Sequence, residues 1–254
     1  MEPTSSRPDD TTSTATDAGV AEEGESNAVD LADEELEEIR DFFERNPPGT
    51  DGESGESGAL NIVTFDGLQY RIPISGDFVS VLADDRSVVV QIRIEAGDMT
   101  NVAAVVTDYP VEITGDGTLT IDGEVVELAD GTYVPLIDNA AIFREGDVYT
   151  LGWPGEGDER FRLDVTIEGD ELRITTFLPP ALEGLVNGLN GDGDGSPEND
   201  LTSRSGVTLQ PDAAPADLLT FAESWAVGED ESLFGCEPGE FSSKNDFGEF
   251  EFGC

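Results

Sequence analysis

The stretch LNIVTFDGLQYRIPI, residues 60–74, alternates apolar and polar side chains on either side of an Asp-Gly pair. Alternation with a period of two is typical of a half-buried β-strand, and Asp-Gly accepts the positive φ angles of a tight hairpin turn. We therefore predict two strands, Leu60–Phe65 and Leu68–Ile74, joined by a turn at Asp66-Gly67.

The same pattern continues toward residue 177, with runs rich in Val, Ile, Thr, Tyr and Phe between Gly and Asp turns. Asp122-Gly123 and Gly169-Asp170 are two further two-residue hairpin turns. The other expected strands are Phe78–Ala83, Val88–Glu95, Val102–Thr107, Val111–Ile113, Leu119–Ile121, Glu124–Leu128, Tyr133–Leu136, Ala141–Phe143, Val148–Trp153, Phe161–Glu168 and Glu171–Phe177. Short strands at this spacing predict a mainly β fold, an antiparallel β-sandwich or sheet domain with a few short helices, such as Ala181–Val186 and Asp217–Trp225.

Composition divides the chain into five segments. Residues 1–29 are acidic, Thr-rich and poor in apolar side chains, which predicts disorder. Residues 30–48 contain an amphipathic helix at Asp33–Arg45, which ends before a Pro-Pro pair. We expect a flexible linker over residues 49–57, the β domain over 58–240 and a tail over 241–254. The helix carries an apolar stripe at Leu36, Ile39, Phe42 and Phe43, which would dock on the domain or pair with a partner.

The formal net charge of −45 is extreme for a chain of 254 residues, and Lys244 is its only lysine. At low salt such a surface repels itself, whereas at molar salt the Debye length falls to about 3 Å. This composition favours a high-salt environment, as in a halophilic archaeon. Nucleic-acid binding and anionic-membrane binding are disfavoured because no basic cluster exists, and no apolar run is long enough for membrane insertion. The absence of histidine excludes histidine-based triads and histidine-ligated metal sites.

The acidic stretch GLNGDGDGSPENDL, residues 188–201, brings four side chains with oxygen ligands close together on a glycine-rich backbone. These are Asp192, Asp194, Asn199 and Asp200. Ca²⁺ takes six to eight oxygen ligands, and glycine lets a short loop curl around the ion. A solvated acidic turn is the alternative, because the chain has 57 acidic residues. The spacing does not fit an EF-hand, since Pro197 and Ser203 stand where that loop needs Gly and Glu.

Several segments in the same order resemble the von Willebrand factor type D domain family, from about Gly58 to Glu240. They are VTFDGLQY (63–70), GDFV (76–79), VVQIR (89–93), LTIDGEVV (119–126), the acidic loop (188–201), FAESWAV (221–227) and ESLF (231–234). The resemblance implies a β domain of that type with a structural Ca²⁺ ion.

The family's calcium loop maps onto this sequence residue by residue. The resemblance implies side-chain ligands from Asp192 and Asp194, the backbone carbonyl of Ser196, and further ligation by Asn199 and Asp200. The chain departs from the family at Ala59, where relatives have a further aspartate ligand, and it lacks the family's Asp-Pro cleavage bond and many cysteines. Its two cysteines, Cys236 and Cys254, would close one small disulfide loop or pair with another chain.

The family resemblance implies a non-catalytic, calcium-stabilised domain of an extracellular or cell-surface protein, acting in adhesion or assembly. Its partner would be a protein or a surface glycan, and self-association is a further expectation. No secretion signal is visible at the N-terminus. Two alternatives stay open: a carboxylate-based hydrolase with an all-β cleft, and a metal-free scaffold or virion component that binds a partner through the helix at 31–45.

Overall fold

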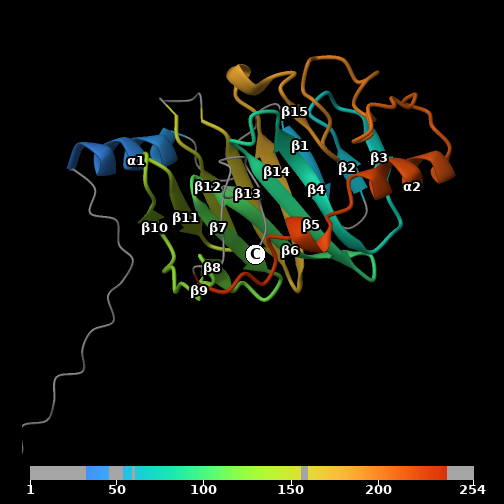
Figure 1. The fold of residues 1–254 in the computed structure, drawn as a ribbon. Coiled ribbons are helices and arrows are strands. Elements are labelled where there is room, and N and C mark those ends of the chain that lie inside the picture. The colour runs from blue at the N-terminus through green and yellow to red at the C-terminus, as the bar shows by residue number, and fades with distance from the viewer. Residues whose placement is uncertain (1–32, 46–53, 59–60, 156–159, 239–254) are drawn as a thin grey trace, which may run out of the picture.

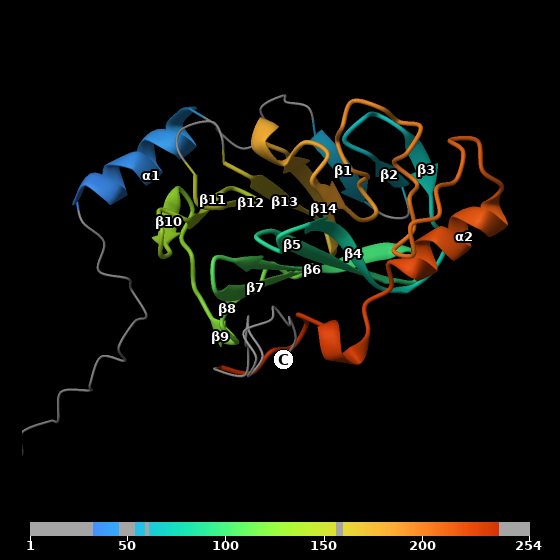
Figure 2. The ribbon, with the colours of Figure 1, turned by 45° about the horizontal axis from the view of Figure 1, so that its top comes forward.

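The computed structural model describes residues 33–45, 54–58, 61–155 and 160–238 of the chain. Two antiparallel β-sheets pack face to face, and this confirms the predicted mainly β sandwich (Figures 1 and 2). Among the described residues, no helix combines the length and the apolar character needed to cross a membrane. The segments predicted as disordered (1–29) and as a tail (241–254) lie outside these residues.

The first sheet contains eight strands in the order β10-β11-β12-β13-β14-β1-β2-β3. Their bounds are β10 Thr132–Pro135, β11 Ala141–Glu145, β12 Val148–Gly152, β13 Arg162–Glu168, β14 Glu171–Phe177, β1 Ser54–Gly58, β2 Asn61–Val63 and β3 Gln69–Arg71. The predicted Gly169-Asp170 turn joins β13 to β14, and Gly169 has φ +75° as such a turn requires.

The second sheet contains seven strands in the order β15-β4-β5-β6-β7-β8-β9. Their bounds are β15 Val186–Asn187, β4 Gly76–Ala83, β5 Val89–Glu95, β6 Asp98–Val106, β7 Tyr109–Thr114, β8 Leu119–Ile121 and β9 Glu124–Val125. Asp122 and Gly123 both have positive φ in the β8–β9 turn, as the sequence predicts. Strand β15 and the 3-10 helix η2 (Pro180–Leu182) replace the short α-helix expected at Ala181–Val186.

Strand β1 lies where the sequence predicts a flexible linker at 49–57, so that prediction is wrong for its last residues. Ser54–Gly58 pairs with β14 on one side and β2 on the other. Ladder hydrogen bonds come from the backbone, so a polar and glycine-rich segment can fill a sheet position without an apolar pattern. A Cβ on Gly55 would overlap the side chain of Asn190, which explains why a small residue is needed there. The β domain therefore begins at residue 54 instead of 58.

The hydrophobic core fills the space between the sheets, where β6 faces β14. Five aromatic side chains of the two sheets and their connections are buried: Phe65, Phe78, Trp153, Phe161 and Trp225. Trp153 and Phe161 meet edge to face with ring centroids 4.9 Å apart. Helix α2 (Pro215–Ser224) closes one end of the sandwich. There the ring of Phe221 packs against the ring of Tyr70 with centroids 5.8 Å apart.

Helix α1 (Asp33–Arg45) lies against β10 and β11 at the edge of the first sheet (Figure 1). Ile39, Phe42 and Phe43 are buried there against Ala141, and the Phe43 ring stacks on Phe143 with centroids 5.2 Å apart. Three of the four residues of the apolar stripe are therefore covered by the chain's own sheet, and Leu36 is half-buried. Of the two predicted roles of the helix, the structure shows docking on the domain. The metal-free scaffold alternative needs an exposed stripe, and the structure does not provide one in the described helix.

We expect Ile39→Val to lower the free energy of unfolding by about 1 kcal/mol, because the lost methylene group leaves a void in a fully buried contact. Urea unfolding followed by circular dichroism would measure this. Val207→Ala is the control, since Val207 is 59% exposed and the change there should stay within about 0.5 kcal/mol. Equal stability of Ile39→Val and the parent would contradict the docking of α1.

Candidate metal centre

Two loops far apart in the sequence form the candidate metal centre: the β2–β3 loop (64–68) and the acidic loop (188–201). The backbone N–H of Phe65 donates to the carbonyl of Asn190 at 2.9 Å. The Thr64 hydroxyl donates to Asp200 Oδ2 at 2.5 Å, and the buried Tyr70 hydroxyl donates to the carbonyl of Leu189. These contacts fix the acidic loop on the end of the first sheet.

A β-bulge in β4 anchors the same loop to the second sheet. The register between β4 and β5 shifts between Val79 and Val81, which leaves Ser80 outside the regular pairing. The carbonyls of Val79 and Ser80 accept the N–H groups of Leu189 and Asn190, both at 3.1 Å. The Ser80 hydroxyl also donates to Asn190 Oδ1 at 2.6 Å, so the fully buried Asn190 connects both sheets to the loop.

Three carboxylates meet at this junction: Asp66 from the β2–β3 loop, and Asp192 and Asp194 from the acidic loop. One oxygen of each lies within 4.8 Å of the others. Asp66 and Asp192 are half-buried and Asp194 is exposed. Like charges this close oppose ionisation unless a cation lies between them, and a hard cation prefers such oxygen donors.

Backbone N–H groups hold the three carboxylates in place. Gly195 donates to Asp66 Oδ1 at 2.9 Å, which links the two loops directly. Ser196 donates to Asp194 Oδ1 at 2.8 Å, and Asp194 donates to Asp192 Oδ1 at 3.4 Å. Each carboxylate thus accepts one backbone hydrogen bond through its Oδ1 atom.

The other predicted ligands lie next to this group but have different roles in the structure. Asn199 contacts it directly, because its Nδ2 donates to Asp192 Oδ2 at 2.6 Å and to Asp194 Oδ2 at 3.0 Å. The carbonyl of Ser196 accepts the N–H of Asn199 at 3.5 Å. Asp200 is 2% exposed and accepts a hydrogen bond from Thr64.

Buried oxygen atoms without hydrogen-bond partners are a second observation that fits a bound cation. Within the described part of the chain, Asp66 Oδ2, Asn199 Oδ1 and Asp200 Oδ1 are buried and have no hydrogen-bond partner. Buried oxygens without a donor are costly, and coordination to a cation is one way to satisfy them. Asp66, Asp192 and Asp194 would hold the ion, with Asn199 and Asp200 beside them.

Burial and mutual repulsion raise the pKa values of the acids here. Burial raises the pKa of Asp192, and the neighbouring Asp194 adds to the effect. Burial raises the pKa of Asp200 to about 7, assisted by Asp66 and Asp192 and opposed by the hydrogen bond from Thr64. Burial also raises the pKa of Tyr70, with a contribution from Asp200.

The raised pKa of Asp200 gives a pH prediction for the metal-free protein. An unfolded aspartate titrates near 3.9, whereas Asp200 in the folded protein titrates at about 7. The folded state therefore binds more protons between these values, and this contribution to stability is lost as pH rises from about 4 to about 7. We expect Asp200→Asn to flatten the pH dependence of unfolding in a chelator over that range. An identical pH profile for the variant and the parent would contradict this assignment.

Asp66 is the member of this carboxylate group that sequence reasoning did not place there, because the Asp66-Gly67 pair indicates only a turn. Its signal is three-dimensional, since Gly195 lies 129 residues away in the sequence. Ala59, where the family has its further aspartate, lies outside the described residues. Cys236 is disulfide-bonded, and because Cys254 also lies outside the described residues, their pairing stays a prediction.

The comparison with known families follows the same segments. The family model described as von Willebrand factor type D domain matches residues 56–207, more than half of the chain. The chain belongs to this family. Its VWD domain thus includes the β2–β3 loop with Asp66 as well as the whole acidic loop.

Curated relatives contain similar domains within longer chains. Sushi domain-containing protein 2 of Homo sapiens is 26% identical over 194 residues, covering 69% of this chain and 23% of that protein. SCO-spondin of Bos taurus is 33% identical over 187 residues, covering 70% of this chain and 3% of that protein. SCO-spondin of Rattus norvegicus is 31% identical over 186 residues, covering 67% of this chain and 3% of that protein. The chain spans less than a quarter of the length of each of these relatives.

Proposed function

We propose that this VWD domain is a non-catalytic assembly domain in which a Ca²⁺ ion ties the acidic loop to the β2–β3 loop. The observation that supports it best is the convergence of Asp66, Asp192 and Asp194 beside buried oxygens without hydrogen-bond partners. When bound, the ion supplies two positive charges and no redox chemistry.

The role of the cation in this proposal is structural. Asp66 lies on the first sheet, and the acidic loop is also held by the bulge of β4 in the second sheet. Ligands from both loops would make the ion a bridge that resists opening of this end of the sandwich. Residues 188–201 would then be ordered as one rigid surface in the loaded protein.

We further propose an extracellular or cell-surface location and a role in adhesion or assembly. The support is membership of the VWD family and similarity to regions of Sushi domain-containing protein 2 and SCO-spondin. The partner would be a protein or a surface glycan, or a second copy of the chain. The net charge of −45 supports operation at high salt, where self-repulsion is screened.

The hydrolase alternative receives little support from the same acids. A glycosidase needs two carboxyl groups that flank a substrate in an open cleft. Asp200, whose pKa is raised to about 7, is 2% exposed and is covered by the two loops. Its position suits a buried structural acid that becomes charged when a cation arrives.

Thermal unfolding in molar salt tests the proposed function. We expect the melting temperature to rise with calcium concentration and to fall on addition of a chelator, because a ligand that binds only the folded state stabilises it by about 2.7 kcal/mol at one hundred times Kd. Magnesium is the control ion, and it should act more weakly because it demands a tighter octahedral site. A melting temperature indifferent to both calcium and chelator would contradict the proposal.

A further inference from the structure

A C-terminal segment lies on the outer face of the second sheet, opposite the face that meets the first sheet (Figure 2). We call residues 231–236 of this segment the strap. Its side chains Leu233 and Phe234 are 1% and 9% exposed, although they lie outside the main core. The calcium proposal gives the strap no role.

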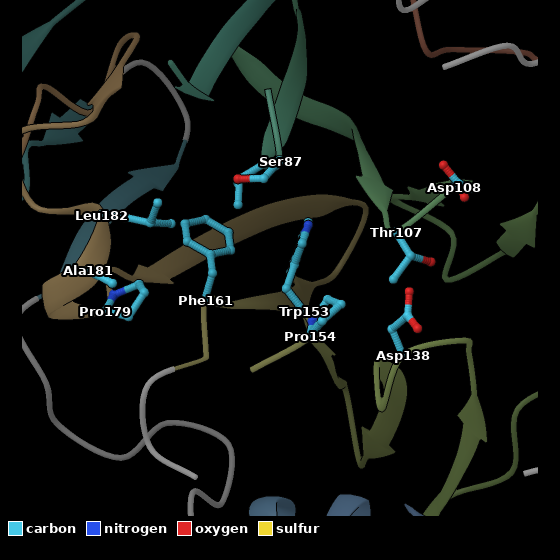
Figure 3. A pocket seen from close by; sticks show the side chains of 11 residues that line it. Ser87, Thr107, Asp108, Asp138, Trp153, Pro154, Phe161, Pro179, Ala181 and Leu182 are labelled. Atoms are coloured by element: carbon cyan, nitrogen blue, oxygen red, sulfur yellow. The ribbon is translucent and has the colours of Figure 1, made fainter. Parts of the chain in front are cut away.

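The strap completes a small apolar cluster of its own. The cluster has five buried members, which are Val89, Ala103, Val105, Leu233 and Phe234. The main core lies on the other face of the same strands and extends to Trp153 and Phe161, beside the pocket in Figure 3. Release of the strap would therefore expose one face of the second sheet and leave the main core closed.

Polar side chains of the sheet bind the backbone of the strap. Gln91 uses both ends of its amide, because Nε2 donates to the carbonyl of Glu231 at 2.7 Å and Oε1 accepts the N–H of Leu233 at 2.9 Å. Glu112 Oε2 accepts the N–H of Gly235 at 3.0 Å. Gln91 and Glu112 lie in one cross-strand row over β5, β6 and β7. This row forms a binding site for a peptide backbone.

Two arginine side chains contact the strap as well. The guanidinium of Arg93 lies 4.4 Å from the ring centroid of Phe234 and is held by two hydrogen bonds to Asp77. Arg204 pairs with Glu231 at 2.8 Å, but this ion pair is partly exposed and adds little. The face therefore fits a segment with neighbouring Leu and Phe side chains.

The strap is joined to the domain by a short connection. The N–H of Val227 donates to the carbonyl of Asp77 in β4 at 2.9 Å, and the 3-10 helix η3 (Glu229–Glu231) then leads into the strap. Gly228 and Asp230 in this connection are exposed. The strap belongs to no strand of the described structure. A segment with few apolar contacts and an exposed connection opens locally at a lower free energy than the central strands.

One part of the chain forms this site and another part of the same chain fills it. Two copies that exchange straps therefore make the same contacts twice, in a closed pair with two-fold symmetry. We propose that the outer face of the second sheet is an assembly surface that takes the strap of a second copy of this chain. The inference deepens the assembly role proposed above and rests on it. High salt favours the exchange, because it screens the repulsion between chains of net charge −45.

A mixture of two variants tests the exchange without competition from each chain's own strap. Ala103→Arg blocks the face and keeps the strap, whereas Leu233→Ala/Phe234→Ala weakens the strap and leaves the face empty. In analytical ultracentrifugation at molar salt, we expect each variant alone to sediment as a monomer and the equimolar mixture to sediment as a dimer. The parent should need a higher concentration to dimerise, because its own strap is tethered beside the face.

Gln91→Ala is the second face variant, and it adds no bulk to the sheet. Placed in the chain with the weakened strap, it removes two hydrogen bonds from the face and should raise the Kd of the mixed dimer about tenfold. Two controls match the other changes at exposed positions. Gln210→Arg adds the same charge as Ala103→Arg, and Leu185→Ala/Val207→Ala removes two apolar side chains. A mixture of these control variants should sediment like the parent.

Hydrogen exchange of the unmodified monomer tests whether the strap opens by itself. The amides of Leu233 and Gly235 are bound by side chains of the sheet, whereas the amides of β6 lie in the middle of the sheet. We expect the two strap amides to exchange at least about a hundredfold faster than those of β6.

Three results would overturn the inference. They are a variant mixture that stays monomeric, strap amides that exchange as slowly as those of β6, and dimers that persist when both chains carry the weakened strap. The last result would assign self-association to another surface. Each of these outcomes would leave the calcium-dependent melting temperature untouched, and a melting temperature indifferent to calcium would leave the exchange of straps untouched. The two proposals therefore fail separately.

Discussion

Asp66→Asn and the double variant Asp192→Ala/Asp194→Ala will lose the rise in melting temperature that saturating calcium gives the parent protein. Both changes remove oxygen ligands from the group that would hold the ion. The loss should equal the whole calcium-dependent part of the stability, about 3 kcal/mol at calcium concentrations well above Kd. Calorimetry at fixed calcium concentration would measure it. Glu198→Gln is the matched control, because Glu198 lies in the same loop but outside the group.

The same Asp66→Asn variant has the opposite effect in a chelator. Without a cation, Asp66 repels Asp192 and Asp200, and its replacement by a neutral side chain relieves that repulsion. The variant should therefore be at least as stable as the parent in a chelator and less stable in calcium. A variant that is destabilised equally under both conditions would show that Asp66 acts only through its hydrogen bond with Gly195.

Gly191→Ala will cost about 3 kcal/mol or more, because the new methyl group adds a steric clash to a strained backbone. Gly191 has φ +78°, and a Cβ there would overlap the carboxylate of the buried Asp200. Gly206→Ala provides the matched control, since Gly206 has φ +81° and its new methyl group would meet no other part of the protein within 4 Å. The control should cost only the backbone contribution, about 1 kcal/mol.

The difference in unfolding free energy between these two glycine variants measures the contribution of packing around Gly191 in the acidic loop. Urea unfolding in a chelator would measure both, so that metal binding does not contribute. Equal costs at the two positions would mean that Asp200 is free to move away from residue 191. That result would contradict the close packing of Gly191 against the Asp200 carboxylate.

Most of the fold could be predicted from the sequence because alternation and turn chemistry are local signals. The Asp122-Gly123 and Gly169-Asp170 turns appear as expected, and so do β8 and β14, whereas β9 ends at Val125 instead of Leu128. Strand β1 could not be predicted, because its SGESG sequence is polar and its partners β14 and β2 determine its structure. Strand β15 has only two residues and depends on β4 in the same way.

The site was predictable only in part, for a similar reason. Asp192 and Asp194 lie in one loop, and their spacing with glycine indicates a cation site directly. Asp66 belongs to a different loop, and only the folded sheet brings it to them. Sequence spacing reveals ligands within one segment but not those contributed by another.

A crystal grown in calcium, with anomalous diffraction recorded at long wavelength, tests the central claim most directly. The claim predicts a calcium peak between Asp66, Asp192 and Asp194, with ligand oxygens at about 2.3–2.6 Å. A well-ordered acidic loop with no anomalous peak among these carboxylates, or with calcium bound only elsewhere, would contradict it.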